Sequence, residues 1–404
     1  MRASPLILLA LAVAAFLSVH NVPSSAQEPI RIGVLTIRSG PATPVGDDIL
    51  AGIETATKTQ GQLLGRPIEL IVEESQWNAQ QAVTKATKLV QQNKVAAILG
   101  TSTVEALALV PVADRLGVPI ITSNSGGAAL TRQNCNKWVF RTNAEDVMST
   151  EALRFLISQH PKLKSANWYT LGHDYPFSRL VAGTVKGVKE LKYVGDTFAA
   201  MDTTDWSSHI ARARAAGATA IMVSVTLGTP MLQFLQQAND FGLSKEAQLV
   251  APIGLPDWLV AKLGALSTNV ISAGSWAAWR YEDTQPTTKR FNEEFFKSHG
   301  RVAGMQAIQS ASATMMLYSA IAKAGSTDPD KIVAALEAVE VPTPVGPLKF
   351  QQGGRQAMVP LFLGPYEAVN PPRYGAQFAQ RVEAAFPASK SLTQSAAEAG
   401  CKLK

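Results

Sequence analysis

Hydroxyl and amide side chains gather just after two short apolar runs of this chain, and residues of these types could bind a small polar ligand. The runs are 95–99 and 118–122, and both are typical of buried strands in a parallel sheet. The side chains that follow are Thr101, Ser102 and Thr103 after the first run, and Ser123, Asn124, Ser125 and Gly126 after the second. Ligands of open α/β sheets bind beyond the carboxyl ends of such strands, where helix N-termini leave backbone N–H groups unpaired. The pattern therefore predicts a site for a small molecule with hydrogen-bond acceptors or negative charge.

Both segments also have a purely structural interpretation. Ser102 and Glu105 match a capping box, in which the serine caps a helix and the glutamate reaches back to the N–H of the cap. The segment 123–127 has the composition of an ordinary loop. Its glycine pair, Gly126 and Gly127, would let the backbone come close to a ligand.

The sequence gives little support for catalysis. It contains no G-x-S-x-G elbow, no H-E-x-x-H and no P-loop. His173 and Asp174 are adjacent, but adjacency does not make a nucleophile and base, and the five histidines are scattered. We therefore do not expect this protein to be an enzyme, to bind a metal ion or to carry a cofactor.

Residues 1–26 are typical of a secretory signal peptide. Arg2 precedes an apolar core at 6–17, and the small residues 24–26 precede Gln27. The apolar run is too short for a spanning helix, although a short N-terminal anchor is the alternative. No cysteine follows the core, so a lipid anchor is not expected. The mature chain should begin near Gln27 and leave the cytoplasm.

The charge and the cysteines fit an exported protein. The formal charge of +6 includes Arg2, and the basic residues are scattered, so nucleic acid is not an expected partner. The chain has two cysteines, Cys135 and Cys401. Because disulfides persist outside the cytoplasm, we expect them to pair and to fasten the C-terminal tail to the loop after Thr131; two free thiols are the alternative.

Strands and helices alternate along most of the chain, and this alternation predicts parallel sheets covered by helices. The expected strands are 30–37, 67–72, 95–99 and 118–122, and then, after Arg141, 166–171, 193–198, 219–225 and 248–251. Helices are expected between them, at 48–59, 79–90, from 103, and at 151–158, 176–191, 206–216 and 230–241. The length exceeds one ordinary core, so two domains are expected.

Beyond Gly254 the pattern becomes rich in helices. One strand is expected at 269–273, with helices at 287–298, 306–324 and 329–338. A hairpin is expected between 348–351 and 359–363, and the final segment is expected to be a loosely ordered wrap.

Six segments together resemble the leucine/isoleucine/valine-binding family of type I periplasmic solute-binding proteins, which serve ABC importers. They are IRIGVLTIRSGPATPVGDDILAGIETA, GVPIITSNSGGAALT, WVFRTNAED, GHDYPFSR, TTDWSSHIARARAAGATAIMV and PVGPLKF, in the family's order. No single segment is decisive. The resemblance spans almost the whole mature chain.

The resemblance implies an α/β fold of two Rossmann-like lobes with parallel sheets, joined by a three-crossover hinge that closes on a ligand. The crossovers are expected near 141–143, 252–255 and 341–345. Lobe one would be 27–142 plus 255–341 and lobe two 143–254 plus 342–366, with 367–404 as a C-terminal wrap tied back to lobe one. The implied partners are a small-molecule ligand and the permease subunits of an ABC transporter in the inner membrane. A periplasmic monomer is expected.

The resemblance also assigns ligand contacts. It places a ligand carboxylate at the turn 101–103 and a second ligand loop at 123–126. Tyr175 would form an aromatic wall of lobe two, and Arg38 would lie at the mouth of the cleft. Amino-acid-binding members pair the ligand's ammonium with an acidic residue where this chain has Ile253, and they carry tyrosines where it has Leu227 and Val45.

These differences from the amino-acid-binding members determine which ligand we expect. N–H groups around Ser102, Asn124 and Gly126 suit an anion, whereas Leu227 and Ile253 leave an ammonium unpaired, which is costly. We therefore expect a carboxylate such as an aromatic or short organic acid, and weak binding of branched-chain amino acids. The alternatives are an amino-acid or amide-binding protein, or the ligand-sensing module of a receptor.

Overall fold

The computed structural model describes residues 27–40, 42–274, 279, 281–392 and 394–403. The expected signal peptide lies outside these residues. Among the helices that the structure describes, none has the length and hydropathy needed to cross a membrane.

The first sheet has six strands in the order β2-β3-β1-β4-β5-β6, and all except β2 run parallel. The strands are β1 (Ile30–Thr36), β2 (Gln62–Leu63), β3 (Arg66–Glu74), β4 (Ile98–Ser102), β5 (Ile120–Asn124) and β6 (Val139–Arg141). Between them run α1 (Thr43–Gln60), α2 (Ala79–Gln91), α3 (Thr103–Leu109), η1 (Val110–Val112), α4 (Ala113–Leu116) and η2 (Ala128–Thr131). The central strands are almost fully buried, as expected for a sheet covered on both faces.

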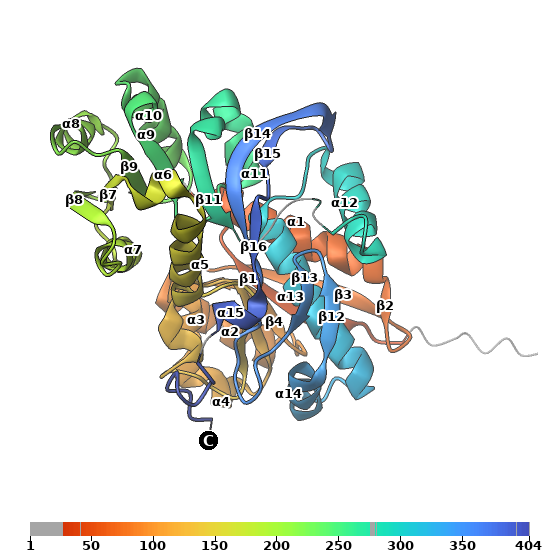
Figure 1. The fold of residues 1–404 in the computed structure, drawn as a ribbon. Helices are drawn as coiled ribbons and strands as arrows, with labels where there is room; N and C mark the ends of the chain where they lie inside the picture. The colour runs from red at the N-terminus through yellow and green to blue at the C-terminus, as the bar shows by residue number, and fades with distance from the viewer. Residues whose placement is uncertain (1–26, 41, 275–278, 280, 393, 404) are drawn as a thin grey trace, which may run out of the picture.

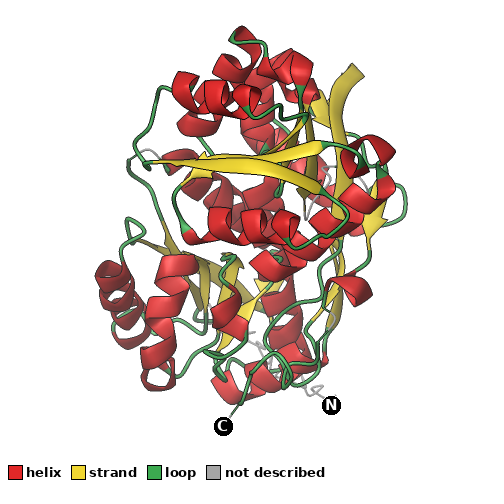
Figure 2. Ribbon diagram, turned by 60° about the vertical axis from the view of Figure 1, so that its left-hand side comes forward, coloured by secondary structure: helices red, strands yellow, loops and turns green. Residues whose placement is uncertain are grey.

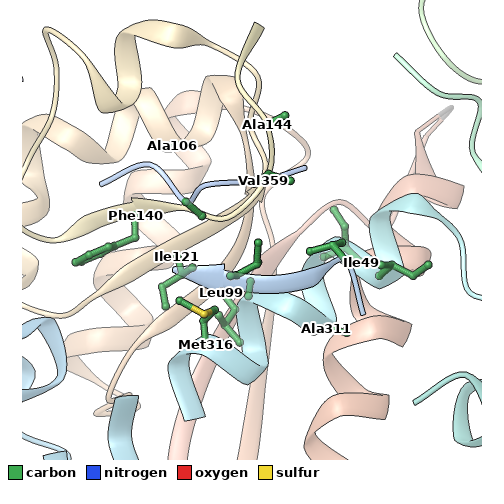
Figure 3. Packing of buried hydrophobic residues seen from close by; sticks show 14 of the residues in the cluster. Ile49, Leu99, Ala106, Ile121, Phe140, Ala144, Ala311, Met316 and Val359 are labelled. Carbon is green, nitrogen blue, oxygen red and sulfur yellow. The ribbon is translucent and has the colours of Figure 1, made fainter. Parts of the chain in front are cut away.

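A later part of the chain completes this lobe. Helices α12 (Pro286–His299), α13 (Met305–Ala324) and α14 (Pro329–Ala338) pack beside it, followed by the hairpin of β12 (Glu340–Thr343) and β13 (Gly346–Lys349). Helix α13 packs against α1 and β5 and is buried along most of its length. Figure 3 shows part of the resulting core, in which Ile49, Leu99, Ile121 and Met316 belong to one cluster.

The second sheet has the order β15-β14-β11-β10-β9-β7-β8, with β16 paired to β14. Its strands are β7 (Asn167–His173), β8 (Lys192–Ala199), β9 (Ala220–Ser224), β10 (Gln248–Ala251), β11 (Val270–Gly274), β14 (Leu361–Arg373), β15 (Ala376–Gln380) and β16 (Ala384–Phe386). Strands β7 to β11 run parallel, and β14 is antiparallel to β11. In Figure 2 the strands form an upper and a lower group, one for each lobe.

Helices flank the second sheet. They are α5 (Asp146–Gln159), α6 (Pro161–Lys164), α7 (Pro176–Lys186), α8 (Ser207–Ala215), α9 (Thr229–Asp240), α10 (Leu243–Glu246), α11 (Asp257–Leu263), η3 (Gly264–Asn269) and α15 (Ala388–Ser391). In Figure 1 the hairpin of β14 and β15 arches away from this sheet toward α12. Its tip contacts that part of the chain, because Tyr374 stacks near Phe296 and Arg373 pairs with Glu282.

Two of the three expected crossovers are wrong. The first, near 141–143, agrees with the passage from β6 to α5. The second does not fall at 252–255, because the chain continues through α11 to β11, and Leu249 of β10 lies in register with Val270. A short apolar strand can extend either sheet, and its sequence does not say which. Residues 255–274 therefore belong to lobe two.

The third crossover also comes later than 341–345. Strand β12 pairs with β13 instead of entering lobe two, and Gln356 still bridges to Arg141 at the edge of the first sheet. The chain joins the second sheet only at β14. By these pairings lobe one comprises 27–142 plus 281–357, and lobe two comprises 143–274 plus 358–392.

The C-terminal region is more ordered than expected. The expected hairpin of 348–351 with 359–363 does not form with those arms, since β13 pairs with β12; residues 349–351 pair instead with 356–358, through the Phe350–Ala357 bridge and two backbone hydrogen bonds of 2.8 and 2.9 Å. Segment 367–392 is not a loose wrap, because β15 and β16 both pair with β14. The disulfide is confirmed: Cys135 and Cys401 are bonded, with Cα atoms 5.3 Å apart. It ties the tail to lobe one.

Candidate functional site

The first half of the candidate site lies where β1, β4 and β5 end. Leu35 lies beside Gly100, and Gly100 beside Thr122, so the next residues of these neighbouring strands follow in a row. These are Thr36, Thr101 and Ser123. The backbone turns sharply here, because Gly100 and Thr101 both have positive φ angles, 96° and 67°. A Cβ on Gly100 would lie 2.3 Å from the Leu35 carbonyl oxygen, so glycine is required.

Three buried hydroxyls in this row have no hydrogen-bond partner among the described residues. They are Thr36 Oγ1, Thr101 Oγ1 and Ser123 Oγ, and each residue is only 1% exposed. A buried polar group without a partner is costly, so we expect these hydroxyls to pair with water or with a bound ligand. Thr36 was not predicted; a threonine at the end of an otherwise apolar strand is the signal that could have revealed it.

The residues of the predicted capping box lie at the start of α3, and its glutamate reaches back to the N–H of Ser102. The Glu105 carboxylate accepts the Ser102 N–H at 2.5 Å and also the hydroxyl of Ser75. Burial raises the pKa of Glu105, and the hydrogen bonds from Ser102 oppose that shift. The N–H of Ser102 is thus used within the protein.

The second loop is also held by protein contacts. The Gly126 N–H donates to Thr103 Oγ1 at 3.0 Å, and the Ser125 N–H donates to Asn143 Oδ1 at 3.2 Å. The expectation that N–H groups near Gly126 are free for a ligand is therefore wrong. The hydrogen-bond partners of a loop depend on which segments the fold places beside it. Here those partners come from α3 and from the first crossover. Asn124 is half-buried at the end of β5.

A buried ion pair fixes this loop to the crossover. Arg141 and Glu145 are both almost fully buried, and their charged groups lie 2.9 Å apart. Arg141 also donates to the carbonyl oxygens of Ser125, at 3.3 Å, and Gly127, at 2.6 Å. Burial lowers the pKa of Arg141 to about 10, while Glu145 opposes the shift. Arg141 stays charged, and Arg132 adds a second cation 2.5 Å from Glu145.

Asp146 lies beside the second loop and was not named by the sequence reasoning. It begins α5, and its N–H donates to the Gly126 carbonyl oxygen at 2.8 Å. Its carboxylate lies against the same glycine, because a Cβ there would be 2.3 Å from Asp146 Oδ1. Burial raises the pKa of Asp146 to about 6, against the opposing charge of Arg141. The available signal was an acidic residue in the first helical turn directly after a predicted crossover.

The second half of the site comes from the carboxyl ends of β7, β9 and β10. Tyr175, Leu227 and Ile253 follow these strands, which are neighbours in the sheet. Burial raises the pKa of Tyr175; the Ser224 and Ser178 hydroxyls oppose the shift, and the charge of Asp146 adds to it. Tyr175 of lobe two therefore lies within electrostatic range of Asp146, which contacts the loop of lobe one.

Two other residues named from the sequence differ in their surroundings. Arg38 is exposed just beyond β1, and its backbone N–H donates to Glu74 at 3.4 Å. Val45 is buried in the core of lobe one. Leu227 is half-buried and packs against both main cores, whereas Ile253 is half-buried after β10.

His173 and Asp174 have separate partners. His173 is fully buried, and its Nδ1 accepts the Thr226 N–H at 3.1 Å. Burial lowers the pKa of His173, so the ring is neutral at pH 7. Asp174 pairs instead with Arg179 at 2.9 Å. Within the described ranges, no group of three or more His, Cys, Asp or Glu side chains is placed to hold a metal ion.

Two parallel α/β sheets joined by three crossovers, with polar and aromatic side chains at facing strand ends, define a type I periplasmic binding protein fold. A family model described as "Periplasmic binding protein" matches residues 29–368, so the chain belongs to that family. By family it is a periplasmic binding protein, and its fold agrees with that assignment.

Individual relatives agree with this assignment. Leu/Ile/Val-binding protein homolog 6 of Brucella melitensis is 24% identical over 359 residues, covering 86% of this chain and 90% of the relative. An amino acid ABC transporter substrate-binding protein from Pseudomonas fluorescens Pf-5 superposes with a TM-score of 0.85 at 20% identity, covering 94% of this chain and all of the other. A Rhodopseudomonas palustris solute-binding protein in complex with 4-hydroxybenzoate gives 0.78 at 21% identity, covering 89% and 97%. At these identities the structures show the fold.

Proposed function

We propose that this protein captures a small organic carboxylate, such as an aromatic or short organic acid, between its lobes and delivers it to an ABC importer. The observation that carries the proposal is the row of buried, unpartnered hydroxyls of Thr36, Thr101 and Ser123. Three O–H donors side by side suit an acceptor-rich group such as a carboxylate. Tyr175, Leu227 and Ile253 of lobe two would offer surface for an aromatic or apolar body.

The proposed site residues are those that line these two strand edges. They are Thr101, Ser102, Thr103, Ser123, Asn124, Ser125, Gly126, Tyr175, Leu227 and Ile253, with Thr36 added and Arg38 at the rim. Ser125 and Gly126 would contribute through the position of their loop beside the ligand. Their backbone N–H groups are already hydrogen-bonded within the protein.

Amino-acid binding is the second candidate, and one observation favours it. The sequence argument against a zwitterion rested on Ile253, which leaves an ammonium unpaired, whereas Asp146 supplies a carboxylate next to Gly126. Relatives are named for both ligand classes, since the Brucella homologue is a Leu/Ile/Val-binding protein homolog and the Rhodopseudomonas protein holds 4-hydroxybenzoate.

A thermal-shift panel tests the ligand class. Aromatic acids, dicarboxylates, amides and the common amino acids are each added to the purified mature protein, because a bound ligand raises the melting temperature by mass action. We expect the largest shifts from monocarboxylic or dicarboxylic acids. Mass spectrometry of ligand retained during purification provides an independent identification, and a retained sugar or cation would contradict the proposal.

We also propose that the mature protein is a periplasmic monomer that docks on permease subunits. The family supports an extracytoplasmic location, and residues 1–26 match a signal peptide. Cell fractionation and the mass of the N-terminal peptide test export and cleavage near Gln27. Light scattering of the purified protein tests the oligomeric state.

A further inference from the structure

The hairpin of β14 and β15 is anchored in lobe two at its base. Tyr366 is buried there, and its hydroxyl accepts the Leu255 N–H at 2.6 Å and the Ser272 hydroxyl at 3.1 Å. From the other strand, the Gln380 side chain donates to the Ser272 carbonyl oxygen at 3.0 Å. These bonds fix the base of the hairpin to the sheet of lobe two.

Beyond this base the hairpin leaves the sheet as an arm. Residues 367–372 are exposed or half-buried, and the pairing of β14 with β15 shifts in register between Ala368 and Arg373. The arm turns at Tyr374 and Gly375, whose positive φ angles of 50° and 78° suit a two-residue hairpin turn. Figure 1 shows the arm arching toward α12 of lobe one. An exposed two-stranded ribbon is marginally stable by itself, so the arm needs support at its tip.

Lobe one supplies that support through polar contacts. Arg373 pairs with Glu282, which is almost fully buried, and Asn292 of α12 donates to the same carboxylate at 2.5 Å. Burial and the charge of Glu282 raise the pKa of Tyr374 to about 12, so its hydroxyl stays protonated at neutral pH. A buried carboxylate without its counter-charge is costly, so the contact between Arg373 and Glu282 holds the tip in place.

Apolar contacts join the same two segments. The Tyr374 ring lies 5.7 Å from the ring of Phe296 on α12. Ala376 of the hairpin and Val302 of lobe one are buried in a small cluster, separate from the two main cores, and Tyr374 packs against it. A contact made by so few side chains can open locally while each lobe stays folded.

We propose that the β14–β15 hairpin is a strap that holds the two lobes in the arrangement of this structure, and that releasing its tip lets them adopt other arrangements. Three crossovers of the chain already join the lobes, and the tip adds a non-covalent link between them. Because the arm is fixed at both ends, rotation of one lobe against the other must detach the tip or bend the arm. This role does not depend on which ligand the cleft takes.

Distances between spin labels on the two lobes test the inference in the protein without ligand. The labels are attached to cysteines introduced at two exposed helical positions, Gln81 of α2 in lobe one and Ala211 of α8 in lobe two. We expect one narrow distance distribution in the otherwise unchanged protein. Arg373→Ala should raise the population at other distances about tenfold or more, as for the loss of a hydrogen bond between charged groups.

Two further variants make the test specific to the tip. Phe296→Ala removes the ring beneath Tyr374, and since Phe296 is 39% exposed its loss should leave lobe one folded and also broaden the distribution. Arg381→Ala is the matched control, because Arg381 lies just after the same hairpin but pairs with Glu367 and Glu383 of lobe two. It should leave the distances unchanged. Melting curves show whether each variant is folded, and if Arg373→Ala is not, Phe296→Ala decides the matter.

Two outcomes overturn the inference. Distance distributions that stay the same in Arg373→Ala and Phe296→Ala would show that the tip does not restrain the lobes. Equal broadening in Arg381→Ala would assign the effect to general loosening of the hairpin. Because no ligand is added, both outcomes are independent of the thermal-shift panel and leave the proposed function untouched.

Discussion

Removing the disulfide should destabilise the protein by an amount set largely by the length of the loop that it closes. Cys135 and Cys401 are 266 residues apart in sequence. In the chain-entropy model, closing a loop of this length removes enough conformational freedom from the unfolded chain to stabilise the folded state by roughly 5–6 kcal/mol. Strain in the native bond and residual structure in the unfolded chain reduce this figure, and removing native disulfides costs about 2–5 kcal/mol, so we expect a loss near the upper end of that range for Cys401→Ser. For a roughly 375-residue chain this corresponds to a fall of about 3–6 °C in melting temperature.

The measurement compares the wild type, Cys401→Ser and Cys135→Ser/Cys401→Ser by chemical denaturation and thermal melting. The double variant separates the loss of the bond from the effect of one exposed thiol. Reducing agent should lower the stability of the wild type to that of the double variant and should not affect the double variant. Beyond β16 the tail also contacts lobe one, because Arg132 donates to Gln394 at 2.9 Å and Ala396 is buried, so Ala396→Ser controls for lost packing. Equal stability of oxidised wild type and double variant would refute the loop-entropy argument.

Further predictions concern the site and the hinge. Thr101→Val should leave the stability without ligand unchanged or slightly higher, because it removes a buried hydroxyl that has no partner, yet it should weaken ligand binding about tenfold in calorimetry. An unchanged affinity would place the ligand elsewhere. Glu145→Gln should destabilise the fold by about 3–5 kcal/mol in urea denaturation, since it leaves the Arg141 guanidinium buried without its counter-charge; a loss below about 1 kcal/mol would show that other groups neutralise Arg141. Saturating ligand should reduce the radius of gyration in solution scattering, and an unchanged curve would mean that the lobes do not close on it.

Local sequence predicted most elements of this chain. Strand Gln248–Ala251 and helix Pro329–Ala338 begin and end as expected. The other elements of the alternating pattern lie within a few residues of their expected positions, except that helices 48–59 and 151–158 begin earlier and helix 176–191 ends earlier. The capping box at Ser102 could also be predicted from the sequence, because it depends on two residues that are three positions apart. Local propensity and apolar periodicity decide such features, and both are written in neighbouring residues.

Tertiary structure decided which lobe each element joins and which site atoms remain free. The strand at Val270–Gly274 was predicted, but an apolar parallel strand fits either sheet, and only its register with β10 assigns it to lobe two. The N–H groups of Ser125 and Gly126 looked available until folding brought Asn143 and Thr103 beside them. Asp146 came to lie beside the second loop for the same reason, because its place against Gly126 joins segments that are twenty residues apart in sequence. The sequence by itself determined the elements and the polar ends of their strands; the contacts between distant segments determined the lobes and the free donors and acceptors of the site.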